Sequence, residues 1–167
     1  MKKRTGIIGV LVAILALGIG YAVVSAVTLN INGSGTITAD PDNFKVHYTG
    51  EVAVTKNPTT ITTTQSHDNA QTGQFTISDL TKAGDTVTFT YTVTNESNGI
   101  NADLAAPTVE TFANTEYFEV TTAREATTLA PGETTTQTVT VTVKKTPVTQ
   151  DETESFTIKL VASPNNN

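Results

Sequence analysis

Apolar and polar residues alternate along much of the chain, which is the pattern expected of β-strands that bury one face. The clearest case is residues 86–95, in which valine, phenylalanine and tyrosine alternate with threonine. Residues 136–143 and 155–162 repeat the alternation. The side chains predicted to face the core in these three strands are Val87, Phe89, Tyr91, Val93, Val139, Val141, Val143, Phe156, Ile158 and Leu160.

A further strand is predicted over residues 43–56, and its alternation changes phase part-way. Phe44, Val46 and Tyr48 share one face, and the pattern then shifts near Gly50. Glycine at a change of phase indicates a β-bulge or a bend. Shorter strands are predicted at residues 59–64, 73–78, 107–112 and 116–121.

Turn-forming residues separate these stretches, in "ADPDN", "KAGD", "NESNG" and "APGE". Two of the turns stand in similar segments, "LTKAGDTVTFTYTVTN" and "LAPGETTTQTVTVTV", which indicates a recurring turn-and-strand unit. Strands with one buried face require two packed antiparallel sheets. The predicted fold is therefore all-β, a two-sheet antiparallel sandwich, and the abundance of threonine and valine agrees with it.

The N-terminus has the order of residues typical of a secretory signal peptide. The basic "MKKR" precedes an uncharged run over residues 6–27, and small residues allow a cut after Ala22 or after Ala26. The alternative is an uncleaved helix that spans a bilayer with its basic end in the cytoplasm. Cleavage is favoured because a period-two pattern begins inside the run, at Val23, Val27, Leu29 and Ile31.

Charge and cysteine content narrow the class of function. All 16 acidic residues follow position 39, and loss of the three basic residues of "MKKR" changes the net charge from −6 to −9. An acidic surface argues against nucleic acid as a partner and favours solubility outside the cell. Because the chain has no cysteine, it forms no disulfide.

Few residues are candidates for catalysis or metal binding. His47 and His67 are the only histidines, and no zinc-binding helix motif, serine elbow or cysteine accompanies them. We therefore predict no enzyme activity, no catalytic residue, no cofactor and no metal site. Asp40, Asp42 and Asn43 offer oxygen ligands for calcium, but a turn is the preferred interpretation.

Two asparagines, Asn32 and Asn95, stand in glycosylation triplets. They matter as acceptors only where secreted chains are glycosylated, and otherwise both are predicted to be turn residues.

Three segments together resemble the TasA/camelysin-like family of secreted bacterial proteins. They are "GIGYAVVSAVTLNINGSGTI", "ISDLTKAGDTVTFTYTVTNESNGINADL" and "TLAPGETTTQTVTVTV". The resemblance implies a leader removed by a dedicated signal peptidase after Ala22, a jelly-roll-like sandwich, and extracellular biofilm fibres in which the mature N-terminus adds as a strand to the next subunit. The turn-and-strand unit also occurs in immunoglobulin-like surface domains.

Apart from the resemblance, the sequence after Ala22 is itself compatible with such a fibre. A cut after Ala22 leaves an uncharged terminal strand, residues 23–32, followed by a flexible hinge at Gly33, Ser34 and Gly35. A strand of this kind completes a neighbour's sheet through main-chain hydrogen bonds, and head-to-tail donation produces filaments. The alternative is that the strand folds back into its own sheet and the protein is a monomer.

These observations predict three parts: residues 1–22 as the signal peptide, residues 23–35 as donor strand and hinge, and residues 36–167 as the sandwich domain. The predicted function is a secreted structural subunit of a matrix fibre or pilus on the cell surface. Its expected partners are other copies of itself and the signal peptidase, with membrane contact only through the N-terminal segment before cleavage. The alternative is a monomeric or membrane-tethered surface or adhesion domain.

Overall fold

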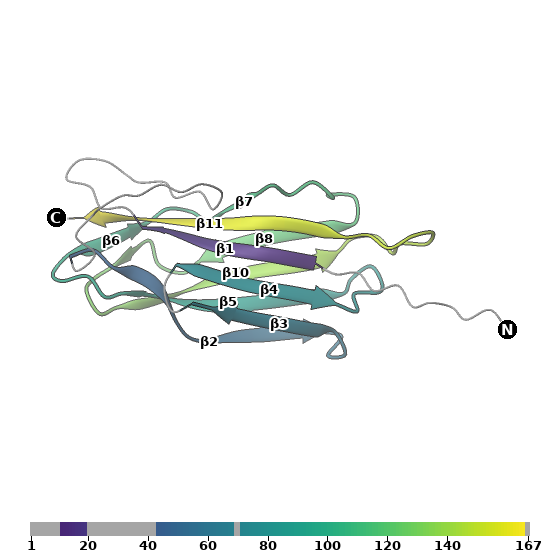
Figure 1. The fold of residues 1–167 in the computed structure, drawn as a ribbon, viewed down its shortest axis with the longest axis horizontal. Helices are drawn as coiled ribbons and strands as arrows, with labels where there is room; N and C mark the ends of the chain where they lie inside the picture. Colours follow the sequence, from purple (N-terminus) through teal and green to yellow (C-terminus); the bar gives the residue numbers. More distant parts are fainter. Residues whose placement is uncertain (1–10, 20–42, 69–70, 166–167) are drawn as a thin grey trace.

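The strands of this protein form two sheets that face each other across one core (Figure 1). The structure, a computed structural model, describes the backbone of residues 11–19 and all atoms of residues 43–68 and 71–165. The strands are β1 (Leu11–Ile19), β2 (Val46–Asn57), β3 (Thr62–His67), β4 (Thr72–Ser78), β5 (Thr86–Asn95), β6 (Asn101–Leu104), β7 (Thr108–Glu110), β8 (Phe118–Arg124), β9 (Thr128–Leu129), β10 (Thr134–Val143) and β11 (Glu154–Asn165).

The first sheet has the order β3-β4-β1-β11-β6-β9, and β7 also pairs with β11. The second sheet has the order β2-β5-β10-β8. Neighbouring strands are antiparallel in both sheets, except that β1 runs parallel to β11. The described residues contain no helix, so none is long and apolar enough to cross a membrane. An all-β fold of two facing sheets agrees with the predicted sandwich.

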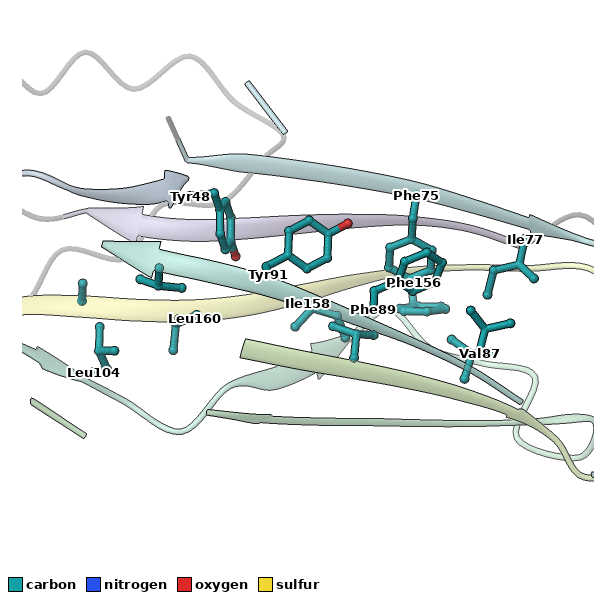
Figure 2. Close-up of a cluster of buried hydrophobic side chains, with 14 of the residues drawn as sticks. Tyr48, Phe75, Ile77, Val87, Phe89, Tyr91, Leu104, Phe156, Ile158 and Leu160 are labelled. Atoms are coloured by element: carbon teal, nitrogen blue, oxygen red, sulfur yellow. The ribbon is translucent and has the colours of Figure 1, made fainter. Parts of the chain in front are cut away.

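The core consists of the alternating apolar residues of the long strands (Figure 2). All ten core positions predicted in β5, β10 and β11 are buried, which confirms the period-two interpretation. Aromatic rings join the two sheets: Phe75 of β4 stacks on Phe89 of β5 with ring centroids 4.1 Å apart. Phe156 of β11 meets the edge of Phe75 at 5.9 Å.

The predicted change of phase in β2 is a β-bulge. The pairing of β2 with β5 shifts register between Thr49 and Ala53. Gly50 lies inside this interval with φ of +71°, a left-handed conformation that glycine adopts without strain. Before the bulge Val46 and Tyr48 are fully buried, whereas Val52 beyond it is only partly covered.

The two similar turns are held by an acidic side chain just before the strand. The carboxylate of Asp85 accepts hydrogen bonds from the backbone N–H groups of Thr81 and Lys82. In the second turn the carboxylate of Glu133 accepts from the backbone N–H of Ala130. The strands that follow, β5 and β10, pair with each other, so the recurring unit builds the centre of the second sheet.

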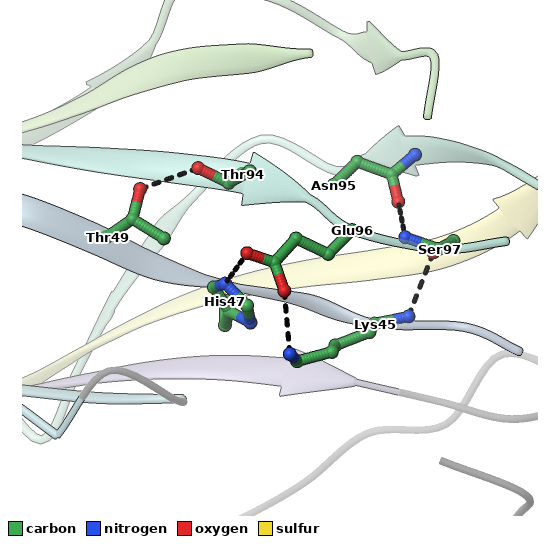
Figure 3. Close-up of polar contacts among 7 residues, drawn as sticks. All are labelled: Lys45, His47, Thr49, Thr94, Asn95, Glu96 and Ser97. Atoms are coloured by element: carbon green, nitrogen blue, oxygen red, sulfur yellow. Dashed lines mark hydrogen bonds and ion pairs between the residues drawn. The ribbon is translucent and has the colours of Figure 1, made fainter. Parts of the chain in front are cut away.

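Asn95 is the last residue of β5, and its side chain holds the turn that follows instead of standing exposed as a glycan acceptor. Its side chain is fully buried, and its amide nitrogen donates to the carbonyl oxygens of Ile100 and Leu129. Its side-chain oxygen accepts from the backbone N–H of Ser97, whose hydroxyl in turn accepts from the N–H of Lys45 (Figure 3). Both hydrogens of the amide nitrogen to which a glycan attaches are therefore engaged inside the fold.

Several short strands differ from the prediction. β3 begins at Thr62 rather than residue 59, and β8 extends to Arg124. β6 and β9 were not predicted. The largest addition is β1, because residues 11–19 form a strand within the stretch predicted as a signal peptide. The predicted division at residues 22 and 35 falls outside the described residues and stays a prediction.

Candidate functional site

β4 and β11 are joined only through β1. Among the strands that the structure describes, neither has a register with the other, and β1 lies between them in the first sheet (Figure 1). β1 pairs antiparallel with β4 from Leu11 to Ala16 and parallel with β11 from Leu11 to Ile19. We call the strand position between residues 72–78 and 154–162 the β4–β11 slot.

The walls of the slot belong to the core. The inward residues of β4 are Gly73, Phe75 and Ile77, and those of β11 are Phe156, Ile158, Leu160 and Ala162; all are buried. The second sheet supports the slot from below, because the hydroxyl of Tyr91 on β5 donates to the carbonyl oxygen of Gln74 at 3.3 Å. A strand in the slot is therefore in register with buried residues on both sides.

The outward residues of the two walls are more polar. On β4 they are Thr72, Gln74 and Thr76, and on β11 they are Ser155, Thr157, Lys159 and Val161. Gln74 and Ser155 are exposed, and the others are partly covered. The slot consequently suits a strand with apolar residues on one face and polar residues on the other.

Removal of β1 opens two strand edges at once. β4 keeps β3 on its other side, and β11 keeps β6 and β7, but each loses its ladder along the slot. Backbone N–H and C=O groups then lack partners above an apolar core, and such an edge readily pairs with another strand. A chain cut after Ala22 lacks β1 and faces this situation.

The predicted donor strand and hinge lie outside the described residues. Val23, Val27, Leu29, Ile31, Gly33, Ser34 and Gly35 all fall between the end of β1 and the point at which the description resumes. Asn43 is held near the turn before β6, because its carbonyl oxygen accepts from the N–H of Asn98. β6 pairs with the end of β11, so Asn43 is near the end of the slot where Ile19 lies.

A second polar cluster surrounds His47, which is buried at the start of β2 (Figure 3). Its Nε2 atom is 3.2 Å from a carboxylate oxygen of Glu96, and the Lys45 ammonium lies 2.6 Å from the other oxygen. The hydrogen bond from Lys45 holds the pKa of the Glu96 carboxyl below its usual value near 4.5. This cluster fastens β2 to the turn that follows β5.

His67 lies at the end of β3, beside the bulge of β2. Its Nε2 atom donates to the carbonyl oxygen of Gly50, and an open depression is lined by residues 50–52 and 65–67. The two histidines belong to separate places in the fold. Within the described residues no three His, Cys, Asp or Glu side chains gather as a metal site. Asp40 and Asp42, the candidate calcium ligands, are outside the described residues.

Comparison of the chain with family models, curated proteins and solved structures finds no match. The function is therefore argued from the fold and the β4–β11 slot.

Proposed function

We propose that this chain is a secreted structural subunit of an extracellular fibre, and that it polymerises when the N-terminal strand of one copy occupies the β4–β11 slot of the next. Removal of residues 1–22 by a signal peptidase opens the slot and frees residues 23–31. The sandwich is of the jelly-roll type, and the chain is a TasA-like matrix protein of the cell surface.

One observation carries the proposal. The two walls of the β4–β11 slot are connected within the first sheet by β1, a strand that comes from the predicted leader. A mature chain has to fill that position with another apolar strand, because an open slot exposes both unpaired backbone and core side chains. Residues 23–31 are the first strand-forming segment after the cut.

Strand donation buries apolar side chains, and this burial favours the contact between copies. Burial of Val23, Val27, Leu29 and Ile31 contributes roughly 6–12 kcal/mol, at about 1.5–3 kcal/mol for each side chain. Main-chain hydrogen bonds to both β4 and β11 add to this contribution. Loss of translational and rotational freedom on association offsets part of it.

The alternative is insertion of residues 23–31 into the slot of the same copy. Asn43 is near the end of the slot where such a strand would leave it. Residues 32–42 reach up to about 35 Å when extended, so the connection is long enough for this route. The two routes differ in their product, because self-insertion gives a closed monomer and donation gives an open polymer.

The experiment starts from the full chain, expressed with its leader in a bacterium that exports it. N-terminal sequencing of the exported protein is expected to give Val23 as the first residue, and electron microscopy is expected to show filaments. Deletion of residues 23–31 is expected to leave a soluble, destabilised domain without filaments. A matched control, Asn30→Asp, changes a position on the polar face of the donor strand and is expected to keep the filaments.

Two results would contradict the proposal. An exported protein that retains residues 1–22 rules out the freed strand. Normal filaments formed by the deletion variant rule out strand donation.

A further inference from the structure

The register of β1 defines which positions of a strand in the slot face the core. Leu11 pairs with Ile77 and Glu154, and Leu15 pairs with Gly73 and Ile158. The odd-numbered residues of β1 are thus level with the buried residues of both walls, apart from Glu154, which is only partly covered. The even-numbered residues are level with the outward residues.

One position in the slot is restricted in size. Ala13 is in register with Phe75 on one side and with Phe156 on the other. These two rings are already in edge contact with each other at 5.9 Å, and both side chains are buried. Interiors are close-packed, so a strand is accepted most easily when it has a small residue between the rings.

Two residues further along β1, the slot has room for a large side chain. Leu15 is in register with Gly73, which has no side chain to fill the space beneath the sheet. A branched apolar residue at this position fills the volume that glycine leaves. A strand therefore fits the slot best when it has a small residue level with Phe75 and Phe156 and a large apolar residue two positions later.

Residues 23–31 meet this requirement in one alignment. Adding twelve to each residue number of β1 places Ser25 between the two phenylalanines and Val27 opposite Gly73. Shifts of ten or fourteen put a valine between the rings, and the shift of ten also needs Tyr21, which a cut after Ala22 removes. The core-facing set in the shift of twelve is Val23, Ser25, Val27, Leu29 and Ile31.

The outward face favours the same alignment. The shift of twelve places Thr28 and Asn30 next to Lys159 and Val161 of β11, on the side that faces solvent. At the positions level with the outward residues of the walls, β1 has only apolar residues and glycine, namely Val12, Ile14, Ala16 and Gly18. The donor segment is thus better matched to the polar face of the slot than the leader segment is.

We propose that the β4–β11 slot accepts residues 23–31 of a second copy in the register of β1 displaced by twelve residues, with Ser25 between Phe75 and Phe156. This inference rests on the proposed function, because it assumes that the donor comes from another copy. It adds the acceptor positions for each donor residue and the reason why one register is selected.

Cysteine cross-linking tests the register, because the natural chain has no cysteine. One chain carries Ala26→Cys, and a second chain carries Gln74→Cys; the shift of twelve makes these residues partners on the outward face. Both chains are expressed with their leaders, collected after export, mixed, assembled and oxidised. A disulfide between two copies is expected, as is one from a second pair, Thr28→Cys with Thr72→Cys.

Controls use donors that are two residues out of register, Val24→Cys or Thr28→Cys with Gln74→Cys. Diagonal neighbours in a sheet are about 7–8 Å apart, beyond the usual Cα separation of a disulfide. The in-register pair is expected to cross-link several-fold more than either control. Ser25→Leu is expected to reduce assembly and Ser25→Ala to preserve it, because only the larger side chain collides with the rings.

The outcomes distinguish failure of the register from failure of the proposed function. Filaments in which an out-of-register pair cross-links best, or in which no pair cross-links, overturn the register and leave polymerisation standing. A single chain can also carry both Ala26→Cys and Gln74→Cys. If its disulfide forms only within a monomer, the donor does not come from a second copy, and the proposed function is overturned as well. Absence of both filaments and cross-links overturns both.

Discussion

At the scale of single residues, the buried polar pair Tyr48–Gln137 is the most demanding feature of the core. The Tyr48 hydroxyl donates to the Gln137 side-chain oxygen at 2.8 Å, and both side chains are fully buried. Burial raises the pKa of Tyr48 above its ordinary value of about 10, so the hydroxyl keeps its proton and remains a donor. Within the described residues the amide nitrogen of Gln137 has no hydrogen-bond partner.

Tyr48→Phe is predicted to destabilise the fold by about 1–3 kcal/mol, because the buried amide then loses its remaining partner. Gln137→Leu alone is predicted to cost a similar amount, since it leaves the tyrosine hydroxyl without an acceptor. The double variant is predicted to lose less unfolding free energy than the two single variants lose together. Urea unfolding of the four proteins measures this coupling, and strictly additive effects would refute it.

The carboxylate of Glu96 gives a prediction about pH. Its pKa is lowered chiefly by the hydrogen bond from Lys45, so the contact stabilises the folded state above the ordinary glutamate pKa of about 4.5. The contribution is lost as the pH falls through the lowered pKa. Glu96→Gln is therefore predicted to lower the urea midpoint near pH 7, and this effect is predicted to shrink as the pH falls below the ordinary glutamate pKa and through the lowered one.

The matched control for this measurement is Glu119→Gln, which changes an exposed glutamate of β8 away from the Lys45 cluster. Because Glu96 is exposed, the effect is small and is read as a difference between the two variants at each pH. An effect of Glu96→Gln that grows as the pH falls would contradict the assigned contact.

At the scale of elements, the two similar turns differ in how deeply their acidic residue is buried. Asp85 is 1% exposed and accepts bonds from two backbone N–H groups, whereas Glu133 is exposed and accepts from one. Asp85→Ala is predicted to destabilise the fold by about 2 kcal/mol, because two backbone N–H groups lose an acceptor that is itself buried. Glu133→Ala is predicted to cost less than half as much. Thermal unfolding of the two variants compares these costs, and an equal loss of stability would contradict the role given to burial of the acidic residue.

β1 itself can be tested in the uncleaved chain. Ile14 and Gln74 are register partners, so Ile14→Cys with Gln74→Cys is predicted to form a disulfide within one chain that retains its leader. Val12→Cys with Gln74→Cys is the control, because Val12 pairs with Thr76. Electrophoresis without reductant detects the link. Equal yields from both pairs would mean that the leader segment does not have this register.

The strands that were predicted from sequence are those with a long alternation. β5 was predicted over its full length because valine, phenylalanine and tyrosine alternate with threonine from Thr86 to Thr94. β6 and β9 are four and two residues long, too short to show a period. β1 is apolar on both faces, and such a run indicates a leader or a buried segment equally well.

The slot could be predicted only in part. The alternation after Ala22 predicts a strand because alternation is a local property of the sequence, and its role as a donor stays a prediction. The acceptor depends on which strands are neighbours, and β4 and β11 are separated by about half of the chain. The small position between Phe75 and Phe156 is visible only when long-range pairing has brought the two rings together.

At the scale of the whole molecule, the fold is a sandwich in which one strand position is filled from a part of the chain that the proposed maturation removes. In the proposed maturation, a cut after Ala22 converts this position into a binding site and at the same time creates the strand that suits it. Donation to a second copy is an open, heterologous contact, so assembly continues as a filament instead of closing into a ring. An acidic surface free of disulfides is consistent with a subunit whose added stability comes from its neighbours.

The most direct measurement is a capping titration of growing filaments. A chain that lacks residues 23–31 keeps the β4–β11 slot but has no strand to donate, so it is expected to accept a donor and to end the polymer. Mean filament length, measured by electron microscopy, is predicted to fall steadily as the fraction of this chain increases, and prior loading of its slot with a peptide of residues 23–32 is predicted to abolish the effect. Filament length that stays constant at every fraction would contradict strand donation into this slot.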